Sequence, residues 1–138
     1  MKINKAVLVK IPKIEDYRGN LSFIEVEKHI PFDIERTYWI YDVPGGQVRG
    51  GHAFKEQFEC IIALSGSFTV TIDYGQFKEY FEMNRSYYAL FVPAGIWRQM
   101  DNFSTNSIAL VLCSTQYTES DYIRNYQDYL IYINETEK

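Results

Sequence analysis

The stretch SFTVTIDYGQFKEYFEM, residues 67–83, consists of two short runs with a glycine between them. Apolar and polar residues alternate in the first run: Phe68, Val70 and Ile72 with Thr69, Thr71 and Asp73. This two-residue period is that of a β-strand with one face packed inward and the other able to meet water. Gly75 can supply the turn into KEYFEM, because glycine tolerates positive φ. The stretch therefore predicts a β-hairpin.

Comparable short runs recur along the rest of the chain. They are AVLVKI (6–11), LSFIEVE (21–27), RTYWIYDV (36–43), CIIAL (60–64), YYALFVP (87–93) and SIALVLCS (107–114). Turn residues separate them, a spacing typical of all-β sandwiches and barrels. Only the last segment, from Thr118 onward, has helical spacing, which predicts a helix over about 119–133 capped by Thr118 or Ser120. We expect one all-β domain, residues 1–138, with a short C-terminal helix.

Composition narrows the classes of function. A formal charge of -4 over 138 residues opposes nonspecific nucleic-acid binding, because phosphate contacts need clustered Lys and Arg. No run approaches the roughly 20 apolar residues of a membrane span, and the N-terminus has no signal-like apolar core, so we expect a cytoplasmic protein without membrane contact. Cys60 and Cys113 lie in apolar runs, which favours buried free thiols over a disulfide.

Two spaced motifs carry the functional signal. From Gly46 to Gly66 the chain reads G-x5-H-x-F-x4-E-x6-G, and from Pro93 to Asn102 it reads P-x-G-x2-R-x3-N. These motifs resemble those of the cupin family, G-x5-H-x-H-x3-4-E-x6-G and G-x5-P-x-G-x2-H-x3-N. The resemblance implies the cupin double-stranded β-helix, a jelly-roll barrel.

The four positions that hold a metal in metal-dependent cupins are His52, Phe54, Glu59 and Arg98 in this chain. Phe54 has no lone pair to donate, and Arg98 carries a permanent positive charge that would repel a cation. Two remaining ligands are too few for a closed site. We therefore expect no metal and no other cofactor, and a polar pocket suited to an anionic or polyhydroxylated ligand.

Within the cupins, the chain resembles the nucleotide-sugar enzymes. The segments that carry this resemblance are DYRGNLSFIE, IPFDIERTYWIYD, RGGHAFK, ALSGS, PAGIWRQM and DYIRNYQDYLIYI. They are similar to the dTDP-sugar 3,4-ketoisomerases, which have about this length, whereas the related 3,5-epimerases are usually longer. The resemblance implies a homodimer that acts on a dTDP-linked 4-keto-6-deoxyhexose. It would make the 3-keto isomer of dTDP-4-keto-6-deoxyglucose for the deoxyamino sugars of cell-surface glycans such as lipopolysaccharide O-antigen or S-layer glycan.

The chemistry of that reaction assigns roles to the candidate catalytic residues. A 4-keto group acidifies the hydrogen on carbon 3, and His52, at the position of the base in the related epimerases, could remove it. The developing oxyanion could be stabilised by Tyr38, Tyr17 or Arg98. Phe54 departs from the family pattern, where a second histidine stands, so a tyrosine or a protonated Glu59 would have to shuttle the second proton.

The diphosphate and the base of the nucleotide require further groups. Arg18 and Arg49 lie beside glycines, where a bending backbone can present a guanidinium to phosphate oxygens. Trp97 could stack on thymine or belong to the core. Two alternatives to the ketoisomerase remain: a sugar-nucleotide-binding cupin without catalysis, which lost its chemistry with Phe54, and a 3,5-epimerase-like enzyme.

Overall fold

A computed structural model describes residues 4–136 of the chain, and most of its regular structure is β-strand. The strands are β1 (Val7–Lys10), β2 (Lys13–Asp16), β3 (Gly19–Ser22), β4 (Arg36–Tyr41), β5 (Arg49–Phe54), β6 (Glu59–Ser65), β7 (Phe68–Asp73), β8 (Lys78–Met83), β9 (Tyr88–Val92), β10 (Trp97–Asp101), β11 (Ile108–Cys113) and β12 (Tyr122–Ile123). A 3-10 turn (Glu119–Asp121) and one helix, α1 (Tyr126–Thr136), complete the elements. The expected all-β barrel with a C-terminal helix is confirmed.

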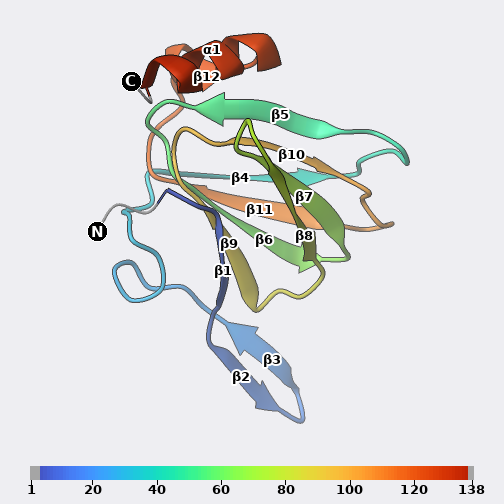
Figure 1. Cartoon of the computed structure of the whole chain (residues 1–138). Helices are drawn as coiled ribbons and strands as arrows, with labels where there is room; N and C mark the ends of the chain where they lie inside the picture. Colours follow the sequence, from blue (N-terminus) through green and yellow to red (C-terminus); the bar gives the residue numbers. More distant parts are fainter. Residues whose placement is uncertain (1–3, 137–138) are drawn as a thin grey trace.

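Two five-stranded antiparallel sheets form the two walls of the barrel. One has the order β1-β9-β6-β11-β4 and the other the order β12-β5-β10-β7-β8 (Figure 1). Strands β2 and β3 form a separate two-stranded hairpin that projects from the barrel on the side away from β5 and α1 (Figure 1). The β2–β3 hairpin therefore lies outside the two walls of the barrel.

The main apolar core lies between the two sheets. Its fully buried members come from both walls and include Ile61, Phe68, Val70, Leu90, Met100 and Val111. Strand alternation sends every second side chain inward, so β6, β7, β9 and β11 each supply two or three of these residues. Burying each large apolar side chain stabilises the fold by about 1.5–3 kcal/mol.

Smaller clusters cover the outer faces of both sheets. Ile30 and Phe32, from the segment before β4, cover Cys60, Ile62 and neighbouring residues of the first sheet. On the second sheet, α1 covers Ala53, Trp97 and Ile123. This second cluster fixes the C-terminal segment beside β5.

The C-terminal segment corrects the predicted helix. A helix over about 119–133 is wrong at its start: Tyr122 and Ile123 pair as strand β12 with Phe54 and Ala53 of β5, and α1 begins only at Tyr126. The edge of β5 needs backbone partners, and a Tyr-Ile pair suits a strand. Asn125, rather than Thr118 or Ser120, caps α1, since its side-chain oxygen accepts the Asp128 N–H at 3.0 Å.

Two further predictions about strands are corrected. LSFIEVE is strand only as far as Ser22, after which the chain forms bends, turns and the isolated bridge Val26–Ile30. The polar face of β7 does not meet water: Thr69, Thr71 and Asp73 are each less than a tenth exposed. Neighbouring strands and α1 cover that face, for example through Thr69 donating to Glu82 at 2.5 Å and Tyr129 donating to the Asp73 carbonyl at 3.1 Å.

Both cysteines are free and buried, as expected. Cys113 belongs to the core between the sheets and Cys60 to the outer cluster of the first sheet, so they lie on opposite faces. Burial raises the pKa of each thiol to about 12, which leaves them protonated and unreactive. Within residues 4–136, no helix has the length and apolar character needed to cross a bilayer.

Candidate active site

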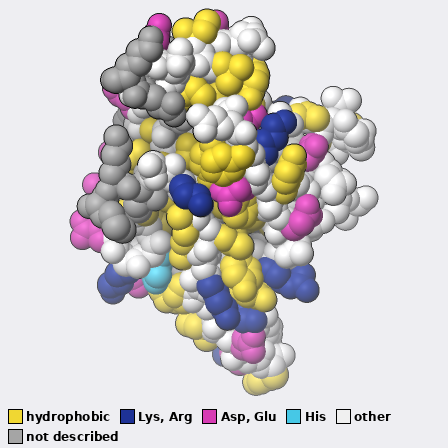
Figure 2. All heavy atoms as spheres, viewed as in Figure 1, with side chains coloured by type: hydrophobic (Ala, Val, Ile, Leu, Met, Phe, Trp, Pro, Cys, Tyr) yellow, Lys and Arg dark blue, Asp and Glu magenta, His cyan; other side chains and the backbone are white. Residues whose placement is uncertain are grey.

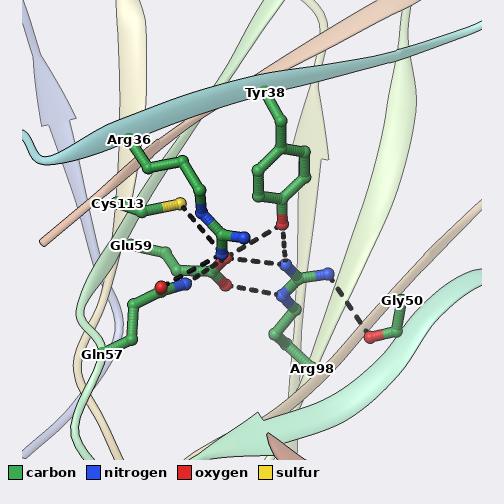
Figure 3. Close-up of polar contacts among 7 residues, drawn as sticks. All are labelled: Arg36, Tyr38, Gly50, Gln57, Glu59, Arg98 and Cys113. Carbon is green, nitrogen blue, oxygen red and sulfur yellow. Dashed lines mark hydrogen bonds and ion pairs between the residues drawn. The ribbon is translucent and has the colours of Figure 1, made fainter. Parts of the chain in front are cut away.

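A buried ion pair lies inside the barrel and joins its two walls. Glu59, at the start of β6, accepts hydrogen bonds from Arg98 of β10, Nε to Oε1 at 2.8 Å and Nη2 to Oε2 at 2.9 Å (Figure 3). Both side chains are 1% exposed. Tyr38 of β4 completes the group: its hydroxyl accepts from Arg98 Nη2 at 2.7 Å and donates to Glu59 Oε2 at 3.0 Å. These three predicted site residues therefore converge.

The electrostatics of this group follow from its burial. Burial opposes the charge on Arg98, but Glu59 and Tyr38 more than offset this and raise the pKa of Arg98. Burial also raises the pKa of Tyr38. The positive charge of Arg98 acts in the opposite direction, and the negative charge of Glu59 raises the pKa further. The pair is therefore charged and internally satisfied, and Tyr38 stays a phenol.

Further polar side chains, those of Gln57 and Arg36, extend this network. Gln57 donates to Glu59 Oε2 at 3.4 Å and accepts from Arg36 Nη2 at 3.1 Å (Figure 3). It also accepts from Thr115 at 2.7 Å. Arg36 Nε is buried without a partner among the described residues. An arginine with an unused buried donor is suited to an anion that enters from outside the chain.

His52 lies beside this network on β5, directly opposite Arg98 of β10. It is 7% exposed, and its Nε2 is buried without a hydrogen-bond partner among the described residues. Burial, followed by the charges of Arg98, Arg124 and Arg36, lowers the pKa of His52 to about 2. The imidazole is therefore neutral at physiological pH, with a nitrogen that is free to accept a proton.

This lowered pKa predicts an acid-sensitive fold. In the unfolded chain His52 takes up a proton below about pH 6.5, whereas the folded protein excludes it down to about pH 2, so the free energy of unfolding falls as the solution is acidified. The slope from this group is about 1.4 kcal/mol per pH unit, or about 2 kcal/mol between pH 7 and 5. Urea unfolding at several pH values measures it.

His52→Asn is the matched comparison for that measurement. The variant should lose this part of the pH dependence, whatever its stability at neutral pH. Equal slopes for both proteins between about pH 7 and 5 would show that His52 is not held neutral by its surroundings.

Two aromatic rings cover His52. Phe54, two residues along β5, lies with its ring centroid 4.8 Å away, and Tyr122 of β12 lies 5.1 Å away. Alternation accounts for this, because His52 and Phe54 share one face of β5 and Tyr122 pairs with Phe54 across the strands. Tyr122 was not among the residues predicted from the sequence. A strand prediction for residues 122–123 would have been the signal that could find it.

Gly50 brings the backbone of β5 against Arg98. Its carbonyl accepts from Arg98 Nη1 at 3.3 Å, its φ is +73°, and a Cβ here would lie 2.2 Å from Nη1. Gly50→Ala should therefore lower the free energy of unfolding by about 2–4 kcal/mol, from the strained φ and the displaced guanidinium. Gly46, with φ +83° and nothing within 4 Å of an added Cβ, is the control. Gly46→Ala should show only the cost of the backbone strain. If urea unfolding gave the same loss of stability for both variants, the predicted clash between the added Cβ and Arg98 would be contradicted.

The structure of one chain does not bring Tyr17 and Arg18 to His52. They lie at the tip of the β2–β3 hairpin, on the opposite side of the molecule from β5 (Figure 1). Tyr17 is 97% exposed, and Arg18 pairs with Asp16 at 2.8 Å. Arg49, at the start of β5, instead lines a surface cavity of about 370 Å³ with Trp39, Tyr41 and Gln47.

Trp97 does not face the interior of the barrel. It is 8% exposed and packs beneath α1, 5.2 Å from the Tyr126 ring and 5.7 Å from the Tyr129 ring. Its neighbour Arg98 points inward, so alternation along β10 turns Trp97 outward. The sequence left two roles open for Trp97, and the geometry favours packing in the core over stacking on the ligand.

The arrangement can support proton transfer. It holds a neutral imidazole, a phenol and a buried ion pair, the parts expected for removing a proton beside a carbonyl and stabilising the oxyanion that forms. Glu59 is occupied by Arg98, and among residues 4–136 there is no group of three His, Cys, Asp or Glu side chains placed to hold a metal ion.

Comparison with known proteins shows what this chain resembles. A family model described as WxcM-like, C-terminal (FdtA) matches residues 4–134. The TDP-4-oxo-6-deoxy-alpha-D-glucose-3,4-oxoisomerase of Aneurinibacillus thermoaerophilus is 37% identical over 126 residues, 91% of either chain.

Solved structures agree with these matches. A 3,4-ketoisomerase from Helicobacter canadensis is 36% identical, with a TM-score of 0.91 over 94% of this chain and 97% of the other. The 3,4-ketoisomerase QdtA of Thermoanaerobacterium thermosaccharolyticum, solved as a histidine-to-asparagine mutant with TDP-4-keto-6-deoxyglucose, is 34% identical, with a TM-score of 0.93 over 98% of this chain and 97% of the other.

Proposed function

Because this chain belongs to the WxcM-like, C-terminal (FdtA) family, we propose that it is a sugar-nucleotide 3,4-ketoisomerase. It converts TDP-4-keto-6-deoxyglucose, the compound bound by the similar QdtA mutant, into the 3-keto isomer. The observation that carries this proposal is the neutral His52, which lies inside the barrel opposite Arg98 with an unpaired nitrogen. Such a nitrogen can accept the hydrogen of carbon 3 as a proton.

The anionic substrate increases the basicity of His52. In the free protein its pKa is lowered first by burial and then by the charges of Arg98, Arg124 and Arg36. The negative charge of the diphosphate and of the enediolate offsets these charges when the substrate is bound, so the imidazole accepts a proton more readily in the complex than alone. Arg98 lies at the oxyanion, and the Glu59 carboxylate and the Tyr38 hydroxyl hold its guanidinium in position.

The nucleotide occupies the cavity beside Arg49. The cavity combines this guanidinium with the exposed rings of Trp39 and Tyr41, which supports a diphosphate at the arginine and a thymine against an aromatic face. In this assignment Trp39 or Tyr41 takes the stacking role first expected of Trp97.

The enzyme is a homodimer in which the β2–β3 hairpin of each chain reaches the site of its partner. Ile14 and Leu21 pair across the hairpin and are each 56% exposed, which supports burial against a second chain. Hydrophobic side chains are exposed from the middle of the molecule down to this hairpin (Figure 2). Tyr17 and Arg18 would then act in trans, at the sugar and the diphosphate.

Sedimentation tests the dimer. The wild-type protein should sediment as a dimer, and the Ile14→Asp/Leu21→Asp variant as a monomer with much reduced turnover. Ile131→Asp, on an equally exposed residue of α1, is the control and should stay dimeric. A monomeric wild-type enzyme with full activity would contradict the exchange of hairpins.

The isomerase acts in the cytoplasm and supplies a 3-keto sugar nucleotide for amination and cell-surface glycans. A ketone at carbon 3 is the group that an aminotransferase would consume.

Proton NMR in deuterated water tests the proposed function. Incubation with TDP-4-keto-6-deoxyglucose should give the 3-keto isomer, with changes confined to carbons 3 and 4. Deuterium at carbon 5 would indicate epimerase chemistry instead, and tight binding without any change would indicate a binding protein that lacks catalysis.

A further inference from the structure

The proposed isomerisation needs two proton carriers, and the inference made here depends on that function. One carrier moves the hydrogen from carbon 3 to carbon 4, and the other moves a proton between the two oxygens. His52 can be the first. Phe54, at the position of the second histidine in the resembling ketoisomerases, cannot be the second, because a phenyl ring neither donates nor accepts a proton.

The carriers suggested by sequence are already engaged or far away. The Tyr38 hydroxyl donates its proton to Glu59 Oε2 at 3.0 Å, so that proton is directed away from a substrate. Glu59 accepts two hydrogen bonds from Arg98 and is held as a carboxylate in an ion pair. Tyr17 lies on the projecting hairpin with 97% of its surface exposed, and in the proposed dimer it is engaged in binding the sugar of the other chain.

Tyr122 lies where the missing carrier is needed. It is the cross-strand partner of Phe54, and its ring centroid is 4.5 Å from that of Phe54 and 5.1 Å from that of His52. The next residue, Ile123, belongs to the cluster under α1 on the outer face. Because neighbouring strand residues alternate, Tyr122 must face the interior, on the side of His52.

The surroundings of Tyr122 suit a phenol that gives up and regains a proton. Burial opposes the charge of Arg36, but the neighbouring side chains of Tyr122 and Cys113 outweigh this and raise the pKa of Arg36. The guanidinium of Arg124 lies 4.0 Å from the centroid of the Tyr122 ring. Both cations stabilise a transient phenolate.

We propose that Tyr122 is the second proton carrier and shuttles a proton between the oxygens on carbons 4 and 3 of the ketosugar. His52 takes the hydrogen of carbon 3 as a proton, the released pair forms the bond between carbons 3 and 4, and the carbonyl oxygen on carbon 4 takes the phenol proton. The phenolate then removes the proton of the hydroxyl on carbon 3, and a carbonyl forms there. Carbon 4 receives from His52 the proton that was taken from carbon 3. The phenol and the imidazole are restored, and no oxidant is needed.

Tyr122→Phe, assayed with TDP-4-keto-6-deoxyglucose, tests this role. The substitution keeps the ring against His52 and Phe54 and removes only the hydroxyl. We expect kcat to fall by about 10²–10⁴-fold, the usual contribution of a positioned acid-base group, with the affinity for TDP and the thermal midpoint close to those of the wild type. Tyr126→Phe, the same change four residues later beneath α1, is the matched control and should keep wild-type turnover.

A second substitution separates a proton carrier from a structural tyrosine. Phe54→His places an imidazole beside Tyr122, so the Phe54→His/Tyr122→Phe variant should recover at least about tenfold of the lost kcat. The proposal is overturned if Tyr122→Phe turns over within a few-fold of the wild type, or if its loss is not restored by Phe54→His. A wild-type protein that leaves the ketosugar unchanged would instead overturn the proposed function, on which this role depends.

Discussion

His52→Asn should abolish turnover of TDP-4-keto-6-deoxyglucose, lowering kcat by at least about 10³-fold. Asparagine fills a similar volume but cannot accept the carbon 3 hydrogen as a proton, and a positioned general base typically contributes 10²–10⁴-fold. The affinity for TDP should change little, because His52 is not among the residues that line the proposed nucleotide cavity beside Arg49. NMR assays of product formation, with calorimetric titration of TDP, measure the two quantities.

The chain contains its own control for this substitution. His29 is the other of its two histidines and lies outside the barrel, where its Nδ1 accepts the Glu25 N–H at 2.8 Å. His29→Asn should therefore keep wild-type turnover. If His52→Asn kept it as well, the base would have to be another group.

Glu59→Gln should cause the largest loss of stability among these variants, about 3–5 kcal/mol. Glutamine has nearly the same shape, but it leaves the Arg98 guanidinium buried without a counter-charge. Removing one partner of a buried ion pair typically has a cost of this size. For a domain of 138 residues, whose free energy of unfolding is about 5–15 kcal/mol, the thermal midpoint should fall by well over 10 °C.

The pair between Glu119 and Arg124 is the matched control. It too is bidentate, at 2.7 and 2.9 Å, but its side chains are 60% and 53% exposed. Water screens an exposed pair, so Glu119→Gln should change the free energy of unfolding far less than Glu59→Gln does. Similar losses for both variants would contradict the view that burial makes the Glu59 pair essential.

The sequence predicted the strands whose residues alternate or form apolar runs. The segments corresponding to β4, β6, β7, β9 and β11 were all identified, because their inward residues build the core between the sheets. By contrast, β10 was absent from the predicted runs: it is short, and its inward residues include the charged Arg98, which interrupts the apolar pattern. Gly50 and Gly51 similarly weaken the signal of β5, whose strand character came only from the motif around His52.

For the site, motif spacing brought together residues far apart in sequence. Tyr38, His52, Glu59 and Arg98 come from four strands and share the barrel interior, as the resemblance to cupins implied. Motif spacing could not show that Glu59 and Arg98 neutralise each other, nor that Trp97 faces outward, because both depend on which face of a strand meets which layer.

The sequence could not predict where Tyr122 and the β2–β3 hairpin lie, for different reasons. Helical spacing in the last segment concealed the two residues of β12, which form a strand because β5 offers them backbone partners. Tyr17 and Arg18 follow a family pattern, but a single chain places them far from His52, and the role proposed for them depends on a second chain.

The fate of deuterium placed at carbon 3 of TDP-4-keto-6-deoxyglucose tests most directly whether His52 removes that hydrogen. With the wild-type protein, NMR should show the label leaving carbon 3 as the 3-keto isomer forms, and with His52→Asn it should stay in place over the same period. Label retained by the wild type, or lost equally fast from both proteins, would contradict the assignment of His52 as the base.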